Sequence, residues 1–588
     1  MTAFRVWAAH ARRVELALGK AGADRRPMAV DAVPDRTAGW WQLEVPEAGP
    51  GTRYGFVLDG GGPYPDPRSP RQPDGVHGLS ALVDHAAFAW TDQAFRPRPL
   101  ADAVLYELHV GTFSAAGTFE GAIPHLDALV ELGVTHVELL PVASFPGRRG
   151  WGYDGVDLYA PHEPYGGPDG LRRLVDACHG RGLAVILDVV YNHLGPDGNY
   201  LGKFGPYFSD RYVTPWGDAV NYDDAGSDEV RRFVIDNALM WIRDYHVDGL
   251  RLDAVHEIFD RSAVHILEQL ATEVHDLGEE LGRPACVIAE SDLNDPRLVR
   301  PVEDGGLALD AQWDDDFRHA LHVTLTGERD AYHAAYQGIG DLAKALADVF
   351  VYDGRWSSFR NRQHGRPVGD LPATRFVGFL QNHDQVGNRA FGQRSAALMS
   401  PGALRIGAAV VLLAPTVPLL FMGDEWAAST PWQFFTDHAE PDLARAVREG
   451  RRREFAQFLP EDGEVPDPQD PDTMRRSCLD WSERDRVEHA AMLGWYRRLI
   501  AYRAAHPELR DGSRCAVRFD GRACWLTAER HGIVLAINAS AETRRVPLGP
   551  STLPGVVALA SDDAVRIEGR DLRLPAWSAA VIEVGREA

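Results

Sequence analysis

The sequence predicts an α/β protein: a (β/α)8 TIM barrel with an N-terminal β-sandwich module and a small C-terminal all-β domain. Two observations predict this fold class. In the middle of the chain, short apolar runs alternate with helical patterns such as LRRLVDACHGRG, which is typical of a parallel α/β sheet. Near both ends, apolar and polar residues alternate, as in half-buried antiparallel strands. The domains we expect are 1–95, 96–507 and 508–588.

The N-terminal module is predicted from short alternating segments that are separated by glycine and proline clusters. Apolar residues alternate through Val14–Leu18 and again at Trp41, Leu43 and Val45. These segments favour an immunoglobulin-like or glucan-binding-like sandwich over 1–95. The run FRPRPL at 95–100 predicts a linker, because its prolines fit neither a helix interior nor a central strand.

Eight apolar runs predict the barrel strands: AVLYELHV, THVELLPV, LAVILDVV, VDGLRLDAV, PACVIAES, LALDAQWDD, RFVGFLQNHD and VPLLFMGDE. Eight such runs over about 400 residues fit a barrel with insertions better than an open doubly wound sheet. A stretch rich in Gly, Tyr and Asp, about 194–223, predicts a long irregular loop that forms a wall of the cleft. Alternation returns in CWLTAE, GIVLAINAS and AAVIEV, which predicts the C-terminal β domain over 508–588.

Composition and charge exclude several classes of partner. The 588-residue chain carries a formal net charge of −24, which disfavours nucleic acid and anionic membranes because both attract clustered cations. Its five cysteines form no CxxC pair, so we expect a reducing compartment and no zinc site. We see neither a secretory signal nor an apolar run long enough to span a bilayer. The expected location is therefore cytoplasmic.

Four polar motifs end predicted barrel strands: DVVYNH (188–193), GLRLDAVH (249–256), IAESD (288–292) and QNHDQ (381–385). In a (β/α)8 barrel all carboxyl-terminal strand ends face one side, so these motifs should share a pocket. Retaining glycoside hydrolysis needs two carboxyl groups about 5 Å apart, one as nucleophile and one as general acid/base. We expect Asp253 to be the nucleophile and Glu290 the acid/base.

Further polar groups complete the expected pocket. Arg251 lies two residues before Asp253 on the same strand face, where its cation would keep that carboxylate ionised. Asp384 would hold sugar hydroxyls and favour a distorted ring, while His193 and His383 donate hydrogen bonds in the same subsite.

Each of these residues also has an ordinary structural interpretation. A single Asp at a strand end is more often a helix cap than a catalyst, and His193, His383 or Tyr153 alone is more often a packing residue. Asp188 and Asn192 are interpreted either as structural hydrogen-bonding residues or as oxygen ligands of a metal. Because no dense carboxylate set lies near them in the sequence, we expect no metal and no cofactor. Only the four motifs together favour catalysis.

The four motifs resemble those of the α-amylase superfamily of glycoside hydrolases, residue for residue at the functional positions. The resemblance implies that Asp253 is the nucleophile, Glu290 the acid/base and Asp384 the stabiliser of the transition state. The implied substrate-binding residues are Tyr153 of WGYDG, His193, Arg251, His256, Glu257, Asp292, His383, Gln385 and the arginine beside Asn388 in QNHDQVGNR.

Longer strings are similar to one family within that superfamily, the maltooligosyltrehalose trehalohydrolases. These strings include VWAAHARRVELAL, ELHVGTFSAAGTFEGAI, LDVVYNHLGPDGNYL, AESDLNDPRLV and FMGDEWAASTPWQFFTDH. The resemblance implies hydrolysis of the α-1,4 bond next to the terminal trehalose of maltooligosyl trehalose, a substrate made by a partner synthase. His256, Glu257 and Asp292 are expected to contact the leaving trehalose.

Two other functions stay open from the sequence. A glucan branching enzyme is similar in the N-terminal module, in WGYDG and in the catalytic carboxylates, but it transfers the chain to a sugar 6-hydroxyl. The strings HLGPDGNYL and FFTDH, which we expect on the acceptor side, favour the trehalohydrolase. A catalytically silent glucan-binding protein is disfavoured, because Asp253, Glu290 and Asp384 are all present.

Overall fold

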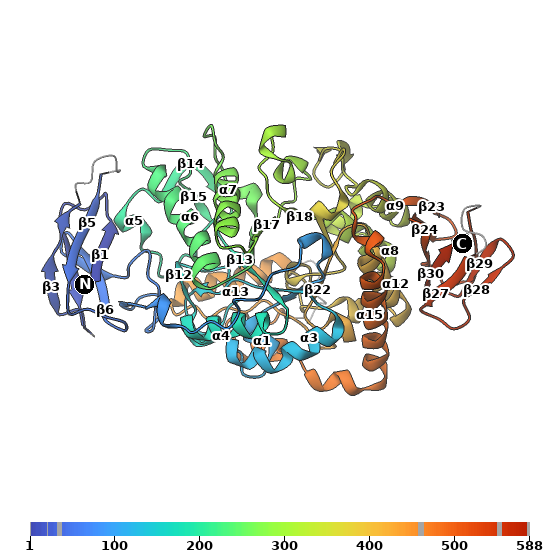
Figure 1. Ribbon diagram of the computed structural model, residues 1–588, viewed down its shortest axis with the longest axis horizontal. Coiled ribbons are helices and arrows are strands. Elements are labelled where there is room, and N and C mark those ends of the chain that lie inside the picture. The colour runs from blue at the N-terminus through green and yellow to red at the C-terminus, as the bar shows by residue number, and fades with distance from the viewer. Residues whose placement is uncertain (1, 20, 32–37, 457–463, 550–554, 585–588) are drawn as a thin grey trace.

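The computed structural model describes residues 2–19, 21–31, 38–456, 464–549 and 555–584. Figure 1 shows an elongated molecule with the N-terminal strands at one end, the barrel in the middle and the C-terminal strands at the opposite end. The barrel thus separates the two β units. Among the described residues, no helix is long and apolar enough to cross a membrane.

Eight parallel strands close into a barrel in the order β10, β13, β16, β17, β18, β21, β22, β9. Their bounds are β9 Leu105–Leu108, β10 His136–Leu139, β13 Ala184–Val189, β16 Gly249–Leu252, β17 Cys286–Ala289, β18 Ala311–Trp313, β21 Phe376–Phe379 and β22 Val417–Phe421. Each lies inside one of the eight predicted runs, so the predicted barrel is confirmed. The strands are buried on both faces, which is why they are continuous apolar runs rather than alternating ones.

Helices cover the outside of the barrel (Figure 1). The longer ones are α3 Leu126–Leu132, α4 Gly167–His179, α6 Ser227–Asp244, α7 Ile266–Glu280, α8 Asp315–Thr326, α9 Ile339–Asp348, α12 Pro401–Leu413, α13 Pro441–Phe455 and α15 Val487–Ala505. Short helices, some of them in loops, are α1 Val110–Phe113, α2 Phe119–Ala122, α5 Leu201–Phe204, α10 His383–Gly387, α11 Ser395–Leu398 and α14 Pro471–Ser477. The sequence of α4 explains why this segment is a helix. Pro168 stands in its first turn, where proline is favoured, and the helix ends before Gly180. Leu171, Leu174 and Val175 form its buried apolar face.

The N-terminal strands form two sheets, β1-β5-β4 and β3-β2-β6-β7, with β8 paired to β6. Their bounds are β1 Thr2–Trp7, β2 Val14–Leu18, β3 Asp24–Pro27, β4 Ala29–Val30, β5 Trp40–Val45, β6 Arg53–Leu58, β7 Gly61–Tyr64 and β8 Ser80–Ala81. Polar side chains connect this unit to α6. Trp40 Nε1 donates to Glu229 at 2.9 Å, and Arg68 donates to Asp236 at 2.8 Å.

The C-terminal unit contains the five-stranded sheet β23-β24-β25-β30-β27 and the three-stranded sheet β26-β29-β28. Their bounds are β23 Ala516–Asp520, β24 Trp525–Arg530, β25 Ile533–Asn538, β26 Arg544–Pro547, β27 Gly555–Ala560, β28 Arg566–Glu568, β29 Asp571–Leu574 and β30 Ser578–Val584. Arg530 donates to the carbonyl oxygens of Leu413 and Ala414 at the end of α12, at 3.0 and 3.2 Å. This contact anchors the unit to the barrel.

The stretch 194–223 differs from its prediction as an irregular loop. It contains α5 and the antiparallel hairpin of β14 Phe208–Thr214 and β15 Gly217–Val220. The segment is rich in Gly, Pro and Asp, which are typical of loops and turns, so the sequence did not indicate a hairpin. The turn of this hairpin lies at 214–217. Two further short hairpins lie on the barrel, β11 Ala143–Ser144 with β12 Asp157–Pro161, and β19 Arg355–Ser357 with β20 Arg362–His364.

Candidate active site

Parallel register brings the polar strand ends together. In the barrel Asp188 of β13 pairs in register with Arg251 of β16, and β16 pairs in register with β17, which ends one residue before Glu290. Asp253 and Glu290 extend the two strands, donating backbone N–H groups to the carbonyl oxygens of Val189 (3.1 Å) and Leu252 (3.0 Å). The predicted convergence at the carboxyl-terminal face is therefore observed for these motifs.

Arg251 lies at the centre of the site, with a side chain that is fully buried. Its Nη1 donates to Asp188 Oδ2 at 2.7 Å and to Asp253 Oδ1 at 3.0 Å, and its Nη2 lies 2.9 Å from Glu290 Oε2. The guanidinium carbon stands 4.3 Å from the ring centroid of Trp313. Burial alone would lower the pKa of Arg251, but the surrounding carboxylates raise it well above its ordinary value. The Arg251 guanidinium thus forms ion pairs with three acidic side chains.

The backbone at Ala254 also holds Glu290. Ala254 has a φ of 38°, in the left-handed region that residues other than glycine rarely adopt. In this conformation its N–H donates to Glu290 Oε2 at 2.7 Å, and the next N–H, of Val255, donates to the Glu290 carbonyl oxygen at 3.0 Å. Strained backbone persists where surrounding contacts over-determine it, often at functional sites.

A chain of hydrogen bonds runs from β9 across the site. Tyr153 Oη donates to Asp188 Oδ2 at 2.7 Å and lies 2.7 Å from His383 Nε2, while His383 Nδ1 lies 2.5 Å from Glu107 Oε1. Because the single tyrosine proton points to Asp188, His383 must donate from Nε2, and Glu107 accepts from Nδ1. His383 is therefore an imidazolium. Burial alone would lower the pKa of His383, but Glu107 and Asp384 raise it to about 9.

Two buried carboxyls of the site were missed from the sequence. Glu107 on β9 contacts His383 with both carboxyl oxygens. Oε1 lies 2.5 Å from the ring Nδ1, and Oε2 accepts the His383 backbone N–H at 3.0 Å. Glu138 on β10 is 1% exposed, and neither of its carboxyl oxygens has a hydrogen bond within the described residues. Burial, and then the charge of Glu107, raise the pKa of Glu138 well above its usual range. The only available signal was an acidic residue inside an otherwise apolar strand run.

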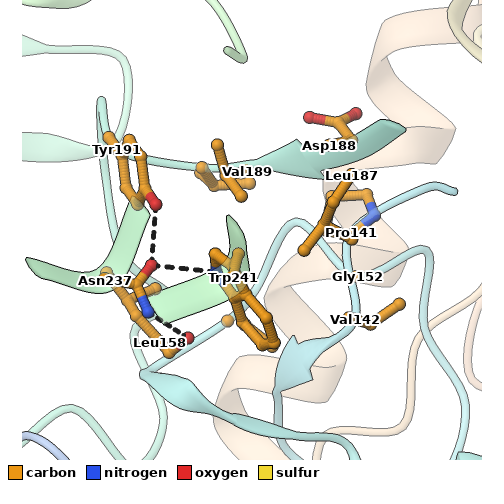
Figure 2. A pocket seen from close by; sticks show the side chains of 13 residues that line it. Pro141, Val142, Gly152, Leu158, Leu187, Asp188, Val189, Tyr191, Asn237 and Trp241 are labelled. Carbon is orange, nitrogen blue, oxygen red and sulfur yellow. Dashed lines mark hydrogen bonds between the residues drawn. The ribbon is translucent and has the colours of Figure 1, made fainter. Parts of the chain in front are cut away.

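Behind Asp188, the opposite face of β13 is fixed by an amide network (Figure 2). Asn237 Oδ1 accepts from Tyr191 Oη at 2.7 Å and from Trp241 Nε1 at 3.1 Å, and its Nδ2 donates to the Leu158 carbonyl at 2.9 Å. The cavity beside this network holds about 10 Å³, room for a single water molecule. The strand that carries Asp188 is thus rigidly supported.

One side of the site opens into a groove of about 400 Å³, the His193 groove, lined by residues of 193–199, Asp154, Phe208, Trp216 and Asp218. His193 stacks on Trp216 with centroids 4.0 Å apart, and burial lowers its pKa to about 4. Trp216, at the tip of the β14–β15 hairpin, is 49% exposed. The structure therefore places the 194–223 segment as a groove wall, as predicted for it.

The other side opens into a groove of about 290 Å³, the Asp292 groove, which Asp384 and Gln385 also line. Arg360, from the turn between β19 and β20, lies 2.9 Å from Asp292 Oδ2. Gln385 Nε2 donates to Asp315 at 3.3 Å. Burial, followed by the charges of Glu290 and Asp384, raises the pKa of Asp315 to about 7. Sequence reasoning missed Asp315 and Arg360.

Some predicted residues stand apart from this arrangement. Asn388 reaches the site, since its Nδ2 donates to Asp384 at 3.2 Å. The neighbouring Arg389 forms a double ion pair with Glu328, at 2.8 and 3.1 Å, and its expected role in substrate binding stays a prediction. His256 and Glu257 follow Ala254 in a half-buried turn, and His256 Nδ1 has no hydrogen-bond partner among the described residues.

The FFTDH segment, which we expected on the acceptor side, lies beside the His193 groove. Asp437 accepts from the Arg148 backbone N–H at 2.7 Å and from Arg149 Nη2 at 2.6 Å. His438 lies 3.8 Å from Asp154, which lines the His193 groove. These ion pairs fix the segment to the loop after β11.

One group of side chains in the described residues has the spacing of a metal site: His322, Glu328 and His333. Arg389 binds both oxygens of Glu328, and Arg318 lies 3.0 Å from His333 Nε2. Two guanidinium groups oppose a bound cation, so we interpret the group as an ion-pair network. The expected absence of a required metal stays a prediction.

A (β/α)8 barrel whose strand ends hold Asp253 and Glu290 on one buried arginine defines a class, the α-amylase type of glycoside hydrolase. Comparison with known proteins agrees. Residues 86–207 match the family model of the alpha amylase catalytic domain, and residues 1–70 match carbohydrate-binding module 48, the isoamylase N-terminal domain.

Comparison with individual relatives identifies the family within this class. A malto-oligosyltrehalose trehalohydrolase of Arthrobacter ramosus is 55% identical over 86% of this chain and 87% of its own. The protein of that name from Rhizobium sp. (strain M-11) is 48% identical over 98% and 97%. The chain belongs to the malto-oligosyltrehalose trehalohydrolase family.

A solved structure and a more distant enzyme complete the comparison. The crystal structure of a candidate alpha amylase from Salmonella typhimurium superposes with a TM-score of 0.89 at 40% identity, covering 99% of this chain and 97% of the other. A 1,4-alpha-glucan branching enzyme of Bordetella pertussis is 31% identical over 76% of this chain and 64% of its own. The branching enzymes, our alternative from the sequence, are thus the more distant relatives.

Proposed function

We propose that this protein is a retaining glycoside hydrolase that cleaves the α-1,4 bond next to the terminal trehalose of maltooligosyl trehalose and releases trehalose. One observation carries the chemistry: Asp253 and Glu290 share the buried guanidinium of Arg251 at the barrel's carboxyl-terminal face. Two carboxyls held this close suit a double displacement, whereas an inverting pair is separated to admit water. Family membership supports the substrate.

In the proposed mechanism Asp253 attacks the anomeric carbon while Glu290 protonates the glycosidic oxygen. Water, deprotonated by Glu290, then hydrolyses the glycosyl–enzyme ester, so the anomeric configuration is retained. The direct ion pair with Arg251 Nη1 holds the Asp253 carboxylate in position for the attack. Glu290 is held by the Ala254 N–H, which fixes one oxygen and leaves the other for the leaving group.

Asp384, Tyr153 and His383 would bind the sugar that undergoes attack. Asp384 is half-buried and lies 3.5 Å from His383 Nε2, so its carboxylate can accept hydrogen bonds from ring hydroxyls. Tyr153 stacks on His383 with centroids 5.1 Å apart, giving a flat wall against which a pyranose can pack. Hydrogen bonds to the sugar hydroxyls that strengthen as the ring flattens stabilise the transition state.

The acid/base marks the leaving-group side, because it must lie over the glycosidic oxygen. Asp292 follows Glu290 by two residues and opens into the Asp292 groove with Arg360. We therefore assign the trehalose unit to this groove and the maltooligosyl chain to the His193 groove. His256 and Glu257, beside Ala254, are proposed to contact the trehalose as well.

Product analysis tests the proposal. The purified protein is incubated with maltotriosyl trehalose and, separately, with amylose. We expect free trehalose and maltotriose, with the α-anomer of maltotriose formed first in NMR spectra, and no α-1,6 branches in amylose. Branches without trehalose would instead identify a branching enzyme. Binding of either glucan without any turnover would revive the catalytically silent alternative.

Selectivity should depend on the Asp292 groove. For Asp292→Ala we expect kcat/KM on maltotriosyl trehalose to fall about 10- to 100-fold, because a charge-assisted contact worth about 1.5–3 kcal/mol is lost. Hydrolysis of maltopentaose, which lacks trehalose, should change by much less. The ratio of the two kcat/KM values is the measurement, and His256→Ala is expected to change it in the same direction. If neither variant changes the ratio, the assignment of this groove is wrong.

The pH profile should depend on Glu107. Because the pKa of His383 is raised to about 9, above its ordinary 6.5, its charge stabilises the fold in full below pH 6.5, and this contribution disappears as the pH rises through 9. In Glu107→Gln the alkaline limb of kcat/KM should move to lower pH by about 1–3 units. Glu138→Gln is the matched control: its raised pKa makes Glu138 neutral already, so the limb should not move.

Two further assignments complete the proposal. We propose that the substrate comes from a maltooligosyltrehalose synthase. We also propose 1–95, 96–507 and 508–588 as the domains, which agrees with the two N-terminal sheets, the barrel and the C-terminal sheets.

A further inference from the structure

A third, larger groove lies next to the His193 groove and has no role in the mechanism above. It holds about 580 Å³ and is lined on one side by residues 72–77, which lie between β7 and β8 of the N-terminal unit. The barrel lines the other side with 144–148, 162–164, Asp197 and Ala439. We call it the distal groove. Its volume lies within the range of small-molecule binding sites. Residues of both the N-terminal unit and the barrel line it.

The distal groove borders the His193 groove along two segments. In the loop 195–199, Gly195, Pro196 and Asn199 line the His193 groove while Asp197 lines the distal groove. In the second segment, His438 contacts Asp154 of the His193 groove and the next residue, Ala439, lines the distal groove. Neighbouring residues of both segments thus line the two grooves.

The lining chemistry suits a neutral polyol. Three carboxylates line the groove, at Asp74, Glu163 and Asp197, with one guanidinium at Arg148. Arg53 pairs with Asp74 and Arg71 with Glu163, so little net charge is left to attract an ionic ligand. His77 is exposed and held by Asp197 at 3.0 Å and by Tyr200 Oη at 2.8 Å, which fixes its ring at the groove edge. The lining thus offers both hydrogen-bond donors and hydrogen-bond acceptors.

The buried base of the groove also contains polar groups that the protein leaves unsatisfied. His162 is 1% exposed and stacks on Phe145 with centroids 3.7 Å apart. Neither of its ring nitrogens makes a well-formed hydrogen bond within the described residues, although the ring lies against the backbone of Arg148. The Gln72 amide is likewise buried against Asp157 without hydrogen-bonding geometry. Buried polar groups of this kind are normally satisfied by water or ligand.

We infer that the distal groove is a remote glucan subsite, which binds the far, non-reducing part of a long maltooligosyl chain and joins the N-terminal unit to the barrel through that chain. This inference rests on the proposed function and extends it, because it makes the enzyme sensitive to the length of the chain. Short substrates would fill only the grooves next to Asp253 and Glu290. Long substrates would gain the additional contacts.

Ala439→Trp tests the inference by filling the groove from an exposed position. Ala21→Trp, the same change at an exposed alanine of the N-terminal unit outside the groove, is the matched control. kcat/KM is measured for trehalose derivatives that carry two to seven glucose units. We expect kcat/KM of the unmodified enzyme to rise with length, and Ala439→Trp to lower it about tenfold for the longest substrates only. His77→Ala should do the same more weakly.

Several outcomes would overturn the inference. They are a length-independent unmodified enzyme, an unchanged profile in Ala439→Trp, or an equal loss on short and long substrates. Failure of the proposed function is distinguishable, since then no variant releases trehalose. In that case, calorimetric titration of maltoheptaose into Asp253→Ala, alone and combined with Ala439→Trp or Ala21→Trp, still tests the groove. Weaker binding with Ala439→Trp alone supports the subsite, and equal binding refutes it.

Discussion

Asp253→Ala is expected to lower kcat for release of trehalose by at least about 10⁴-fold, because no other group can form the glycosyl–enzyme ester. Asp253 is bound to Arg251 Nη1 at 3.0 Å, and the same cation keeps its contacts with Asp188 and Glu290 after the substitution. The fold should therefore survive. Rates are measured by trehalose release from maltotriosyl trehalose, and folding by circular dichroism.

Two controls sharpen this result. Adding azide to Asp253→Ala should restore turnover in part and yield a β-glycosyl azide, since a small anion can enter the vacated space and attack from the same face. Asp295→Ala, at a half-buried helix cap that pairs with Arg297 and lies outside the site, should leave kcat unchanged. Retention of more than a hundredth of the normal rate in Asp253→Ala would remove the residue from its proposed role.

The sequence was sufficient where the physics is local and periodic. Eight largely apolar runs predicted eight buried strands, because a barrel strand packs against helices on its outer face and against the side chains of other strands on its inner face. Arg251 and Asp253 were correctly placed together, since residues two apart on a strand share a face. The structure confirms that the arginine bonds the carboxylate.

Prediction failed where contacts join segments far apart in the chain. Glu107 binds His383 from 276 residues away, and its acidic side chain inside LYEL gave no indication of its partner. Arg360 reaches Asp292 from a turn whose position depends on the folded barrel. Arg389, two residues after the end of α10, pairs with Glu328 from 61 positions away, a contact that the sequence did not indicate. Proximity along the chain is a poor guide after a strand has ended.

Arg251→Met should have the second large effect, on stability as well as rate. The substitution leaves the Asp188, Asp253 and Glu290 carboxyls without their shared cation, and removal of one partner from a buried ion pair costs about 3–5 kcal/mol. Catalysis should also fall, because the ion pairs that hold the Asp253 and Glu290 carboxyls in place are lost. We expect a lower midpoint for the barrel's unfolding transition in calorimetry, together with a loss of trehalose release of at least about 10³-fold.

The loss of stability in Arg251→Met should depend on pH. Asp188 is buried, which raises its pKa to about 7, although Arg251 opposes the shift. A carboxyl whose pKa is raised on folding binds more protons in the folded state, so its contribution to stability decreases as the pH rises. Without Arg251, which lowers the pKa of Asp188, that pKa should rise further, and stability should decrease more steeply with pH. The Arg251→Met defect should therefore be smaller at pH 5 than at pH 8, whereas Arg251→Lys should restore part of the stability but not the three-way geometry. A defect that is equal at both pH values would show that lost packing on Trp313, rather than lost charge, is what destabilises the barrel.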